Sequence, residues 1–382
     1  MLFSQVLGLP HIKNHLTTTV DRGRIPHAQL FVGPSGSGPL PMAIAYAQYI
    51  LCGNLRGENT TGSESCNIKM NKLSHPDLHF AFPVAANARV KKSPVSSHFA
   101  SDWRSFLEHS PYGSLFDWYR ALGVENKQGK IGVDEAQDIV KSLSLKSYEG
   151  GYKIMIIWMA DKMNESCANK LLKLIEEPPE KTLFLLIAEE EDNILQTIHS
   201  RCQVLHFPRL NENVIAGELV QRQYCEGSKA HMVARRANGD YNAALQILRQ
   251  DQGDEQFEQW FIYWVRSAFK AKTNPSALGE LLTWSESLSG EGREVQKKFL
   301  SYCSEFFRQA LHQNYSSPSL VYMEPQTEGF KMENFAPFVH GGNILSITKE
   351  LEEAAYHIER NGNAKIILTD LSIKLTRLIH KK

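Results

Sequence analysis

The sequence predicts an α/β domain with a parallel sheet, followed by an all-α C-terminal third. Two short apolar runs without alternation, Tyr152–Met159 and Thr182–Ala188, are typical of strands that are buried on both faces. Between them, apolar side chains recur at intervals of three and four residues and predict a helix with one apolar stripe. These side chains are Ala168, Leu171, Leu172 and Ile175. Because strands joined by a crossover helix run parallel, the segment predicts a parallel sheet.

The crossover helix has clear ends, and an arginine follows the second strand. Asn164 is suited to the N-cap, and Pro178-Pro179 ends the helix. The chain then reaches Ser200, Arg201 and Cys202, which we expect just beyond a helical turn at the carboxyl end of the sheet. Ligands of open α/β sheets bind along that edge, so these three are candidate site residues.

Length and charge limit the possible classes of protein. A chain of 382 residues is too long for one ordinary core, so two or three domains are expected. The 42 basic and 42 acidic residues cancel, which argues against binding DNA by bulk charge but leaves room for a local basic patch. No signal-peptide pattern follows Met1, and no apolar run reaches about 18 residues. A cytoplasmic protein without membrane association is therefore expected.

The six cysteines are scattered and contain no C-x-x-C pair, so no disulfide framework is predicted. Cys52 and Cys66 flank a polar loop. One interpretation makes them half of a zinc site, which needs four ligands and which His75 and His79 would complete. The favoured interpretation leaves both as free thiols in an exposed loop, with no metal bound.

A strand, a glycine-rich loop and a helix follow one another near the N-terminus. The strand Gln29–Val32 runs into Gly33–Leu40, after which apolar residues recur at helical spacing. This is the layout of a phosphate-binding loop. The glycines of the loop are Gly33, Gly36 and Gly38, of which the first and last match the motif G-x-x-x-x-G.

Two positions of this loop depart from the motif. Pro39 and Leu40 stand where it requires lysine and then serine or threonine. The lysine would reach the β- and γ-phosphates and the hydroxyl would hold Mg²⁺, while proline also removes a backbone N–H from the loop. The sequence therefore predicts a degenerate loop that does not turn over nucleotide and binds no cofactor. Weak residual anion binding is the alternative.

The segment from His79 to Lys130 is rich in aromatic residues, with short helices predicted at Ser101–Leu107 and Leu115–Leu122. Basic residues such as Arg89 lie near these rings, which could indicate nucleic-acid contact. The favoured interpretation is an insertion that packs its aromatic rings onto the main domain. The rings in question are Phe80, Phe82, Trp103, Phe106, Tyr112, Phe116, Trp118 and Tyr119.

The rest of the chain is predicted to be helical. Three helices at Asn211–Gln223, Lys229–Ala237 and Tyr241–Gln250 form a unit that resembles a lid, and the helices beyond it carry broad apolar faces. The predicted domains are an α/β domain at 1–207 with an insertion at about 79–130, a three-helix lid at 208–252, and a helical C-terminal domain at 253–382.

Seven segments of the chain together resemble the clamp-loader branch of the AAA+ proteins. They are Val6–Gly8, Arg24–Ala28, Ala160–Asn164, Ala168–Lys173, Glu176–Pro179, Thr197–Gln203 and Asn363–Leu371. The resemblance covers nearly the whole chain and leaves out only His79 to Lys130. It implies an AAA+ (P-loop NTPase-like) sheet domain, a small helical lid and an all-α collar domain for oligomerisation.

Within that branch the chain departs from the hydrolysing members. They carry an Asp-Glu pair after the strand that corresponds to Ile154–Ile157, where this chain has Trp158-Met159. Asn242 stands where the lid of an active member usually offers an arginine. With the degenerate loop, these losses imply a subunit with no catalytic activity of its own. The branch's common four-cysteine zinc module is also reduced, to Cys52 and Cys66.

The resemblance further implies a role for Arg201, as an arginine finger that reaches the γ-phosphate held by a neighbouring ATPase subunit. An ion pair with a carboxylate, or capping of a helix C-terminus, is the alternative. The implied partners are clamp-loader ATPase subunits of the gamma/tau type, a delta subunit, primed DNA and, indirectly, a sliding clamp. Two rival functions stay open: an ATP-hydrolysing AAA+ motor, and a stand-alone nucleic-acid-binding protein.

Overall fold

The computed structural model describes residues 1–53, 64–148, 151–249, 252–316, 320–321, 323 and 325–381. The chain divides into two compact units. The first comprises 1–124 with 128–248, and the second comprises 125–127 with 249–382. Each unit is described by itself.

The first unit is built on a five-stranded sheet with the strand order β2-β3-β4-β1-β5, in which every pairing is parallel. This confirms the predicted α/β domain with a parallel sheet. The strands are β1 (Ala28–Val32), β2 (Leu78–Ala81), β3 (Lys153–Trp158), β4 (Thr182–Ala188) and β5 (Gln203–His206). All residues of β1, β3 and β4 are buried, as the runs without alternation predicted.

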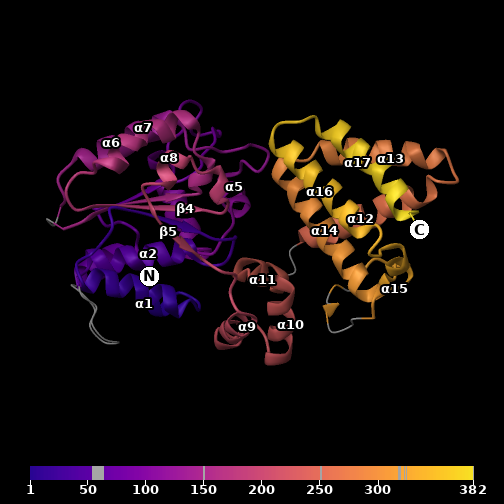
Figure 1. Cartoon of the computed structure of the whole chain (residues 1–382), viewed down its shortest axis with the longest axis horizontal. Coiled ribbons are helices and arrows are strands. Elements are labelled where there is room, and N and C mark those ends of the chain that lie inside the picture. Colours follow the sequence, from indigo (N-terminus) through magenta and orange to yellow (C-terminus); the bar gives the residue numbers. More distant parts are fainter. Residues whose placement is uncertain are drawn as a thin grey trace. The chain divides into compact units, whose positions relative to one another are not determined.

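Helices cover both faces of the sheet. In Figure 1, α1 (Pro10–Asp21) and α2 (Pro39–Leu51) lie on one face, and α6 (Val133–Ser144) and α7 (Glu165–Glu176) lie on the other. Successive residues of β3 serve the two layers in turn. Ile154 and Ile156 belong to the core on the α2 side, whereas Met155 and Ile157 belong to the core on the α7 side.

The segment that the sequence set apart as an insertion contributes a strand to the sheet. His79 to Ala81 belong to β2, which pairs with β3 at the edge. The predicted start of the insertion is therefore wrong, because so short a strand carries no pattern that separates it from a loop. The helices of this segment are η2 (Ser96–Phe99), α4 (Ala100–His109) and α5 (Leu115–Leu122).

The aromatic rings of this segment form a packed cluster. Trp103 stacks on Phe82 with 4.2 Å between ring centroids and meets both Trp118 and Trp158 at 5.1 Å. Apart from Phe80, which is half-buried, the eight rings named from the sequence are buried. The packing interpretation is thus confirmed, because buried rings are not accessible for stacking on bases.

Short helical segments and a three-helix lid complete the first unit. They are η1 (Phe3–Gln5), α3 (Glu64–Asn71), η3 (Ala160–Lys162), η4 (Glu191–Asn193), α8 (Gln196–His199), α9 (Glu212–Gln221), α10 (Gly227–Ala237) and α11 (Tyr241–Leu248). The lid helices share their apolar core with α2, through residues such as Ile215, Val233 and Ala244. The described part of the last lid helix ends at Leu248, within the predicted range.

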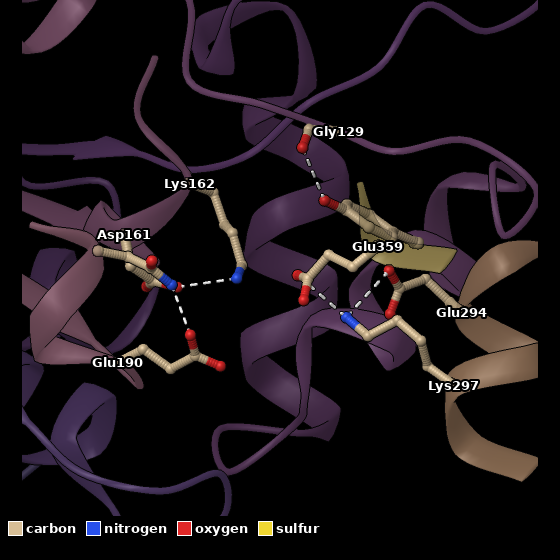
Figure 2. Close-up of polar contacts among 9 residues, drawn as sticks. Gly129, Asp161, Lys162, Glu190, Glu294, Lys297 and Glu359 are labelled. Atoms are coloured by element: carbon tan, nitrogen blue, oxygen red, sulfur yellow. Dashed lines mark hydrogen bonds and ion pairs between the residues drawn. The ribbon is translucent and has the colours of Figure 1, made fainter. Parts of the chain in front are cut away.

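Helices alone make up the second unit, as predicted. They are α12 (Gln252–Lys270), α13 (Ser276–Ser289), α14 (Arg293–Asn314), α15 (Met332–Phe335), η6 (Ala336–Phe338), α16 (Ile344–Glu359) and α17 (Ala364–Ile379). Trp264 stacks on Trp284 in its core, with 4.9 Å between ring centroids. Lys297 on α14 lies between Glu294 and Glu359 and so links α14 to the end of α16 (Figure 2).

The cysteine prediction is corrected by the structure. Cys52 and Cys66 form a disulfide that joins the end of α2 to α3, and both are buried rather than exposed free thiols. Their spacing of 14 residues did not show this, because the pairing depends on how α3 folds back onto α2. With both sulfurs in the disulfide, neither is a thiolate ligand for zinc. No cluster of three or more potential ligands suited to a metal ion occurs among the described residues.

Across the described parts of both units, every helix is too short or too polar to span a lipid bilayer.

Candidate functional site

The glycine loop lies where a phosphate-binding loop is expected, between the end of β1 and the start of α2. Gly38 is the N-cap of α2 with a φ of 102°, a value that favours glycine. Pro39 is the first residue of the helix, where its ring fits but where it presents no N–H to an anion. The backbone route of a phosphate loop is therefore present, with one of its donors missing.

The space above the loop is almost filled. The cavity that the loop bounds measures about 30 Å³, enough for one or two water molecules. Ligand pockets of the usual kind measure about 300–1,000 Å³. Besides the loop, the cavity is lined by Tyr112 from the insertion, by Trp158 and Met159 at and just after the end of β3, and by Glu189 after β4.

Tyr112 lines this space and lies close to the loop. A Cβ atom on Gly38 would lie 3.1 Å from its ring, and its hydroxyl accepts a hydrogen bond of 2.8 Å from the backbone N–H of Leu7. Its ring also packs edge-on against Tyr241 of the lid, at 5.1 Å between centroids. Sequence reasoning named Tyr112 only as one ring of the insertion. Nothing in its spacing showed that it would lie over the loop.

The lid touches the loop directly. The backbone N–H of Tyr241 donates to the carbonyl oxygen of Gly36 at 3.2 Å. Asp240 fills the space where Gly36 lacks a side chain, since a Cβ atom there would lie 1.8 Å from its Oδ1. Burial raises the pKa of Asp240 to about 6. An acidic group of the lid therefore lies beside the glycine loop.

Asn242, where the resemblance implies an arginine, has a different use. Its Nδ2 donates to Oδ2 of Asp117 on α5 at 2.7 Å, and Gln246 donates to the other carboxylate oxygen at 3.0 Å. The residue thus fastens the lid helix α11 to the insertion. It presents no cation to the loop.

The end of β3 carries no carboxylate, but two carboxylates lie nearby. Trp158 is packed against Trp103 within the aromatic cluster. Asp161 has a fully buried side chain and an ion pair with Lys162 at 3.0 Å (Figure 2). Burial, and then the charge of Asp161, raise the pKa of Glu189 to about 7, and Glu189 is hydrogen-bonded to Ser35 of the loop. A partly charged carboxylate beside the loop disfavours phosphate binding.

The position of Arg201 differs from the one expected. Arg201 lies two residues before β5, and the first residue of β5, Gln203, pairs with Gln29 near the start of β1. Arg201 therefore lies on the amino-terminal side of the sheet, and the predicted placement at the carboxyl end is wrong. The glycine loop begins at Gly33, four residues beyond Gln29, or about 13 Å along the strand direction. The two features lie at opposite edges of the sheet.

Arg201 is held by three acceptors. Its Nη1 donates to the carbonyl oxygen of Thr197 at 2.6 Å and to Oγ of Ser200 at 3.3 Å. Its Nη2 forms an ion pair with Oε1 of Glu176, the last residue of α7. The carboxylate pairing that the sequence left open is thus present. The Arg201 side chain is still 36% exposed and accessible from solvent.

Ser200 and Cys202 support the turn in different ways. Ser200 closes it through a hydrogen bond from Oγ to the carbonyl oxygen of Thr197 at 3.2 Å, and it touches Arg201. Cys202 packs against the core on the α7 side. Burial raises the pKa of its thiol to about 11, so the sulfur is protonated at neutral pH and poorly nucleophilic.

Comparison with known proteins gives the family. A family model described as "DNA polymerase III, delta subunit" matches residues 8–211. The chain is 26% identical over 245 residues to DNA polymerase III subunit delta' of Bacillus subtilis (strain 168), which covers 64% of this chain and 60% of that relative.

Two further relatives agree. The delta' subunit of Haemophilus influenzae (strain ATCC 51907 / DSM 11121 / KW20 / Rd) is 27% identical over 260 residues, 67% of this chain and 66% of the relative. DNA polymerase III subunit tau of B. subtilis is 28% identical over 254 residues, 65% of this chain and 37% of the relative. The chain thus spans less than two thirds of the length of these relatives. It belongs to the DNA polymerase III delta-prime subunit family.

Proposed function

We propose that this chain is a non-hydrolysing subunit of the DNA polymerase III clamp loader, a component of the polymerase holoenzyme. It helps to load a sliding clamp onto primed DNA, and it supplies Arg201 in trans to a neighbouring ATPase subunit. The observation that carries the proposal is that the glycine loop and Arg201 lie at opposite ends of the sheet, the loop at the carboxyl ends of the strands and Arg201 at their amino ends. One edge has a filled glycine loop, and the other has an accessible arginine.

Loss of hydrolysis is supported by chemistry and by space. The loop lacks the lysine, the hydroxyl and one backbone N–H that a hydrolysing site uses. Tyr112 lies above it, and Asp240 and Glu189 put acidic groups beside it. Each of these features opposes a nucleotide phosphate.

Action in trans is supported by distance. Arg201 lies at the sheet edge opposite its own glycine loop, so a phosphate that it contacts belongs to another chain. A planar guanidinium offers five N–H donors and suits a γ-phosphate better than an ammonium does. Arginine fingers supplied in trans raise hydrolysis by about 10³–10⁵-fold in well-studied nucleotide hydrolases.

The partners follow from the same role. ATPase subunits of the gamma/tau type would supply the nucleotide site, and a delta subunit would complete the assembly. The helical second unit is suited to oligomerisation, because it leaves large apolar side chains exposed on α16 and α17, among them Leu345 at 79% and Ile366 at 66%.

The proposal has a two-part test. In calorimetry, the isolated chain should show no binding of Mg-ATP, and micromolar affinity would contradict the loss of nucleotide binding. In a complex reconstituted with its ATPase partners, Arg201→Ala should leave assembly intact and lower hydrolysis at the adjacent site about 10³-fold or more, in single-turnover measurements with DNA.

A matched control is Arg22→Ala, which removes an exposed arginine of the same unit. It should change neither assembly nor hydrolysis. An Arg201→Ala complex that hydrolyses ATP at the normal rate would contradict the arginine-finger role. This result would hold independently of whether the isolated chain binds Mg-ATP.

A further inference from the structure

Arg201 does not extend freely into solvent. Nη1 uses its two N–H groups on Thr197 and Ser200, and Nη2 uses one on Glu176. Two of the five N–H groups, one on Nε and one on Nη2, have no partner among the described residues. The guanidinium is therefore fixed in one plane while part of its donor set is free to meet an anion.

Glu176 provides the only charged contact in this arrangement within the described residues. It is the last residue of α7, a helix whose apolar face is anchored in the core through Leu171 and Ile175. The two other acceptors, Thr197 and Ser200, lie within four residues of Arg201 on its own turn. Glu176 thus ties that turn to a separate helix whose apolar face is buried in the core.

We propose that Glu176 is a positioning residue for Arg201, which holds the guanidinium in the orientation that meets the neighbouring γ-phosphate. This rests on the proposed function of Arg201 as an arginine finger. Catalysis through a positioned group is sensitive to small displacements, since a shift of about 1 Å can cost about 10²-fold in rate. Without Glu176, the guanidinium keeps only its two hydrogen bonds within its own turn, and its orientation is no longer tied to α7.

A purely structural role would give a different result. Both side chains of the pair are more than a third exposed, and ion pairs of this kind contribute little to stability. Glu176→Ala should therefore fold and assemble normally. The adjacent Glu177 is exposed and makes no side-chain hydrogen bond or ion pair among the described residues, so Glu177→Ala removes the same charge as a matched control.

The test uses the reconstituted complex with its ATPase partners, ATP and primed DNA. Glu176→Ala should lower kcat at the adjacent site about tenfold and leave KM for ATP unchanged, because a finger acts on the transition state rather than on nucleotide binding. Glu176→Gln keeps an acceptor oxygen and should restore most of the rate. Glu177→Ala should hydrolyse ATP like the unaltered complex.

A double variant distinguishes the positioning role of Glu176 from the arginine-finger role of Arg201, on which it rests. In the Arg201→Ala background, Glu176→Ala should have no further effect, because the group that it positions is absent. A further loss there, or an unchanged or increased kcat for Glu176→Ala alone, would overturn the positioning role. If Arg201→Ala itself leaves hydrolysis unchanged, the finger fails, and the positioning role fails with it.

Discussion

Gly36 is the position in the loop where the absence of a side chain allows both the backbone conformation and the contact with the lid. Its φ is +68°, and the space beside its Cα is taken by the carboxylate of Asp240 from the lid. A side chain at this position would meet two obstacles at once: an unfavourable backbone conformation and an occupied volume. Gly23 has nearly the same conformation, with a φ of +65°, but has no atom within 4 Å of a Cβ.

The two glycines allow the obstacles to be measured separately. Gly23→Ala should cost about 1 kcal/mol in unfolding free energy, which is the cost of the backbone conformation alone. Gly36→Ala should cost about 2–4 kcal/mol, because it also displaces Asp240 and the lid. Urea denaturation of both variants gives the comparison. Equal losses would show that the lid does not press on the loop as described.

Single residues differ in how far the sequence revealed them. Pro39 and Trp158 were predictable because each removes a chemical group by its own identity. Tyr112 was not, since its position over the loop depends on the folded course of the insertion. The edge at which Arg201 lies was also missed, because it depends on the path between β4 and β5 rather than on any motif. The carboxylate that pairs with Arg201 was foreseen in kind, but not as Glu176.

At the scale of elements, the helix α5 of the insertion is the anchor of the lid. Asp117 has two roles there. It forms the capping box of α5 with Ser114, and it accepts hydrogen bonds from Asn242 and Gln246 of α11. Among the described residues, the Ser114 side chain takes part only in the cap. Substitutions of these two residues therefore separate the stability of α5 from the attachment of α11 to it.

Ser114→Ala should cost about 1 kcal/mol, the usual effect of losing an N-cap. Asp117→Ala should cost more and should also open the lid, because two hydrogen bonds to α11 are lost with it. Hydrogen exchange of the α11 amides reports the opening. It should speed up in Asp117→Ala and stay close to normal in Ser114→Ala, and similar exchange in both variants would argue against the anchor.

Elements with a local signal were predicted well. Asn164 caps α7 as expected, since its Oδ1 accepts a hydrogen bond from the N–H of Cys167, and α5 has the predicted bounds. The strand β2 was missed as such, because four residues at a sheet edge give too short a pattern. The disulfide was missed for a related reason, as it joins two helices whose packing no local pattern specifies.

At the scale of the whole molecule, buried acids link stability to pH. Burial raises the pKa of Glu135 to about 7 from an ordinary 4.5, although its Oε2 accepts a hydrogen bond from the backbone N–H of Ser96 at 2.7 Å. The folded chain keeps a proton there that the unfolded chain releases between about pH 4.5 and 7. Stability contributed by this group is therefore full below pH 4.5, falls as pH rises to about 7, and then stays constant.

Glu135→Gln removes this dependence and keeps an acceptor for Ser96. Its unfolding free energy relative to the unaltered chain should rise between pH 5 and pH 8, by about 3 kcal/mol at most. Urea denaturation at several pH values tests this. Glu177→Gln, an exposed counterpart, should follow the unaltered chain at every pH, and a Glu135→Gln curve parallel to that of the unaltered chain would contradict the raised pKa.

The positions of Arg201 and the glycine loop at opposite ends of the sheet have a consequence for the number of copies of this chain in an assembly. In subunits that join head to tail, each subunit supplies an arginine from one end of its sheet and binds nucleotide at the other. Such a series continues until it reaches a subunit that lacks one of the two. In its proposed role, this chain supplies an arginine but offers no nucleotide to a neighbour's arginine, since the cavity at its own degenerate loop measures only about 30 Å³. In the role that we propose, it ends the series, and its supply relative to the ATPase subunits limits how many complete assemblies form.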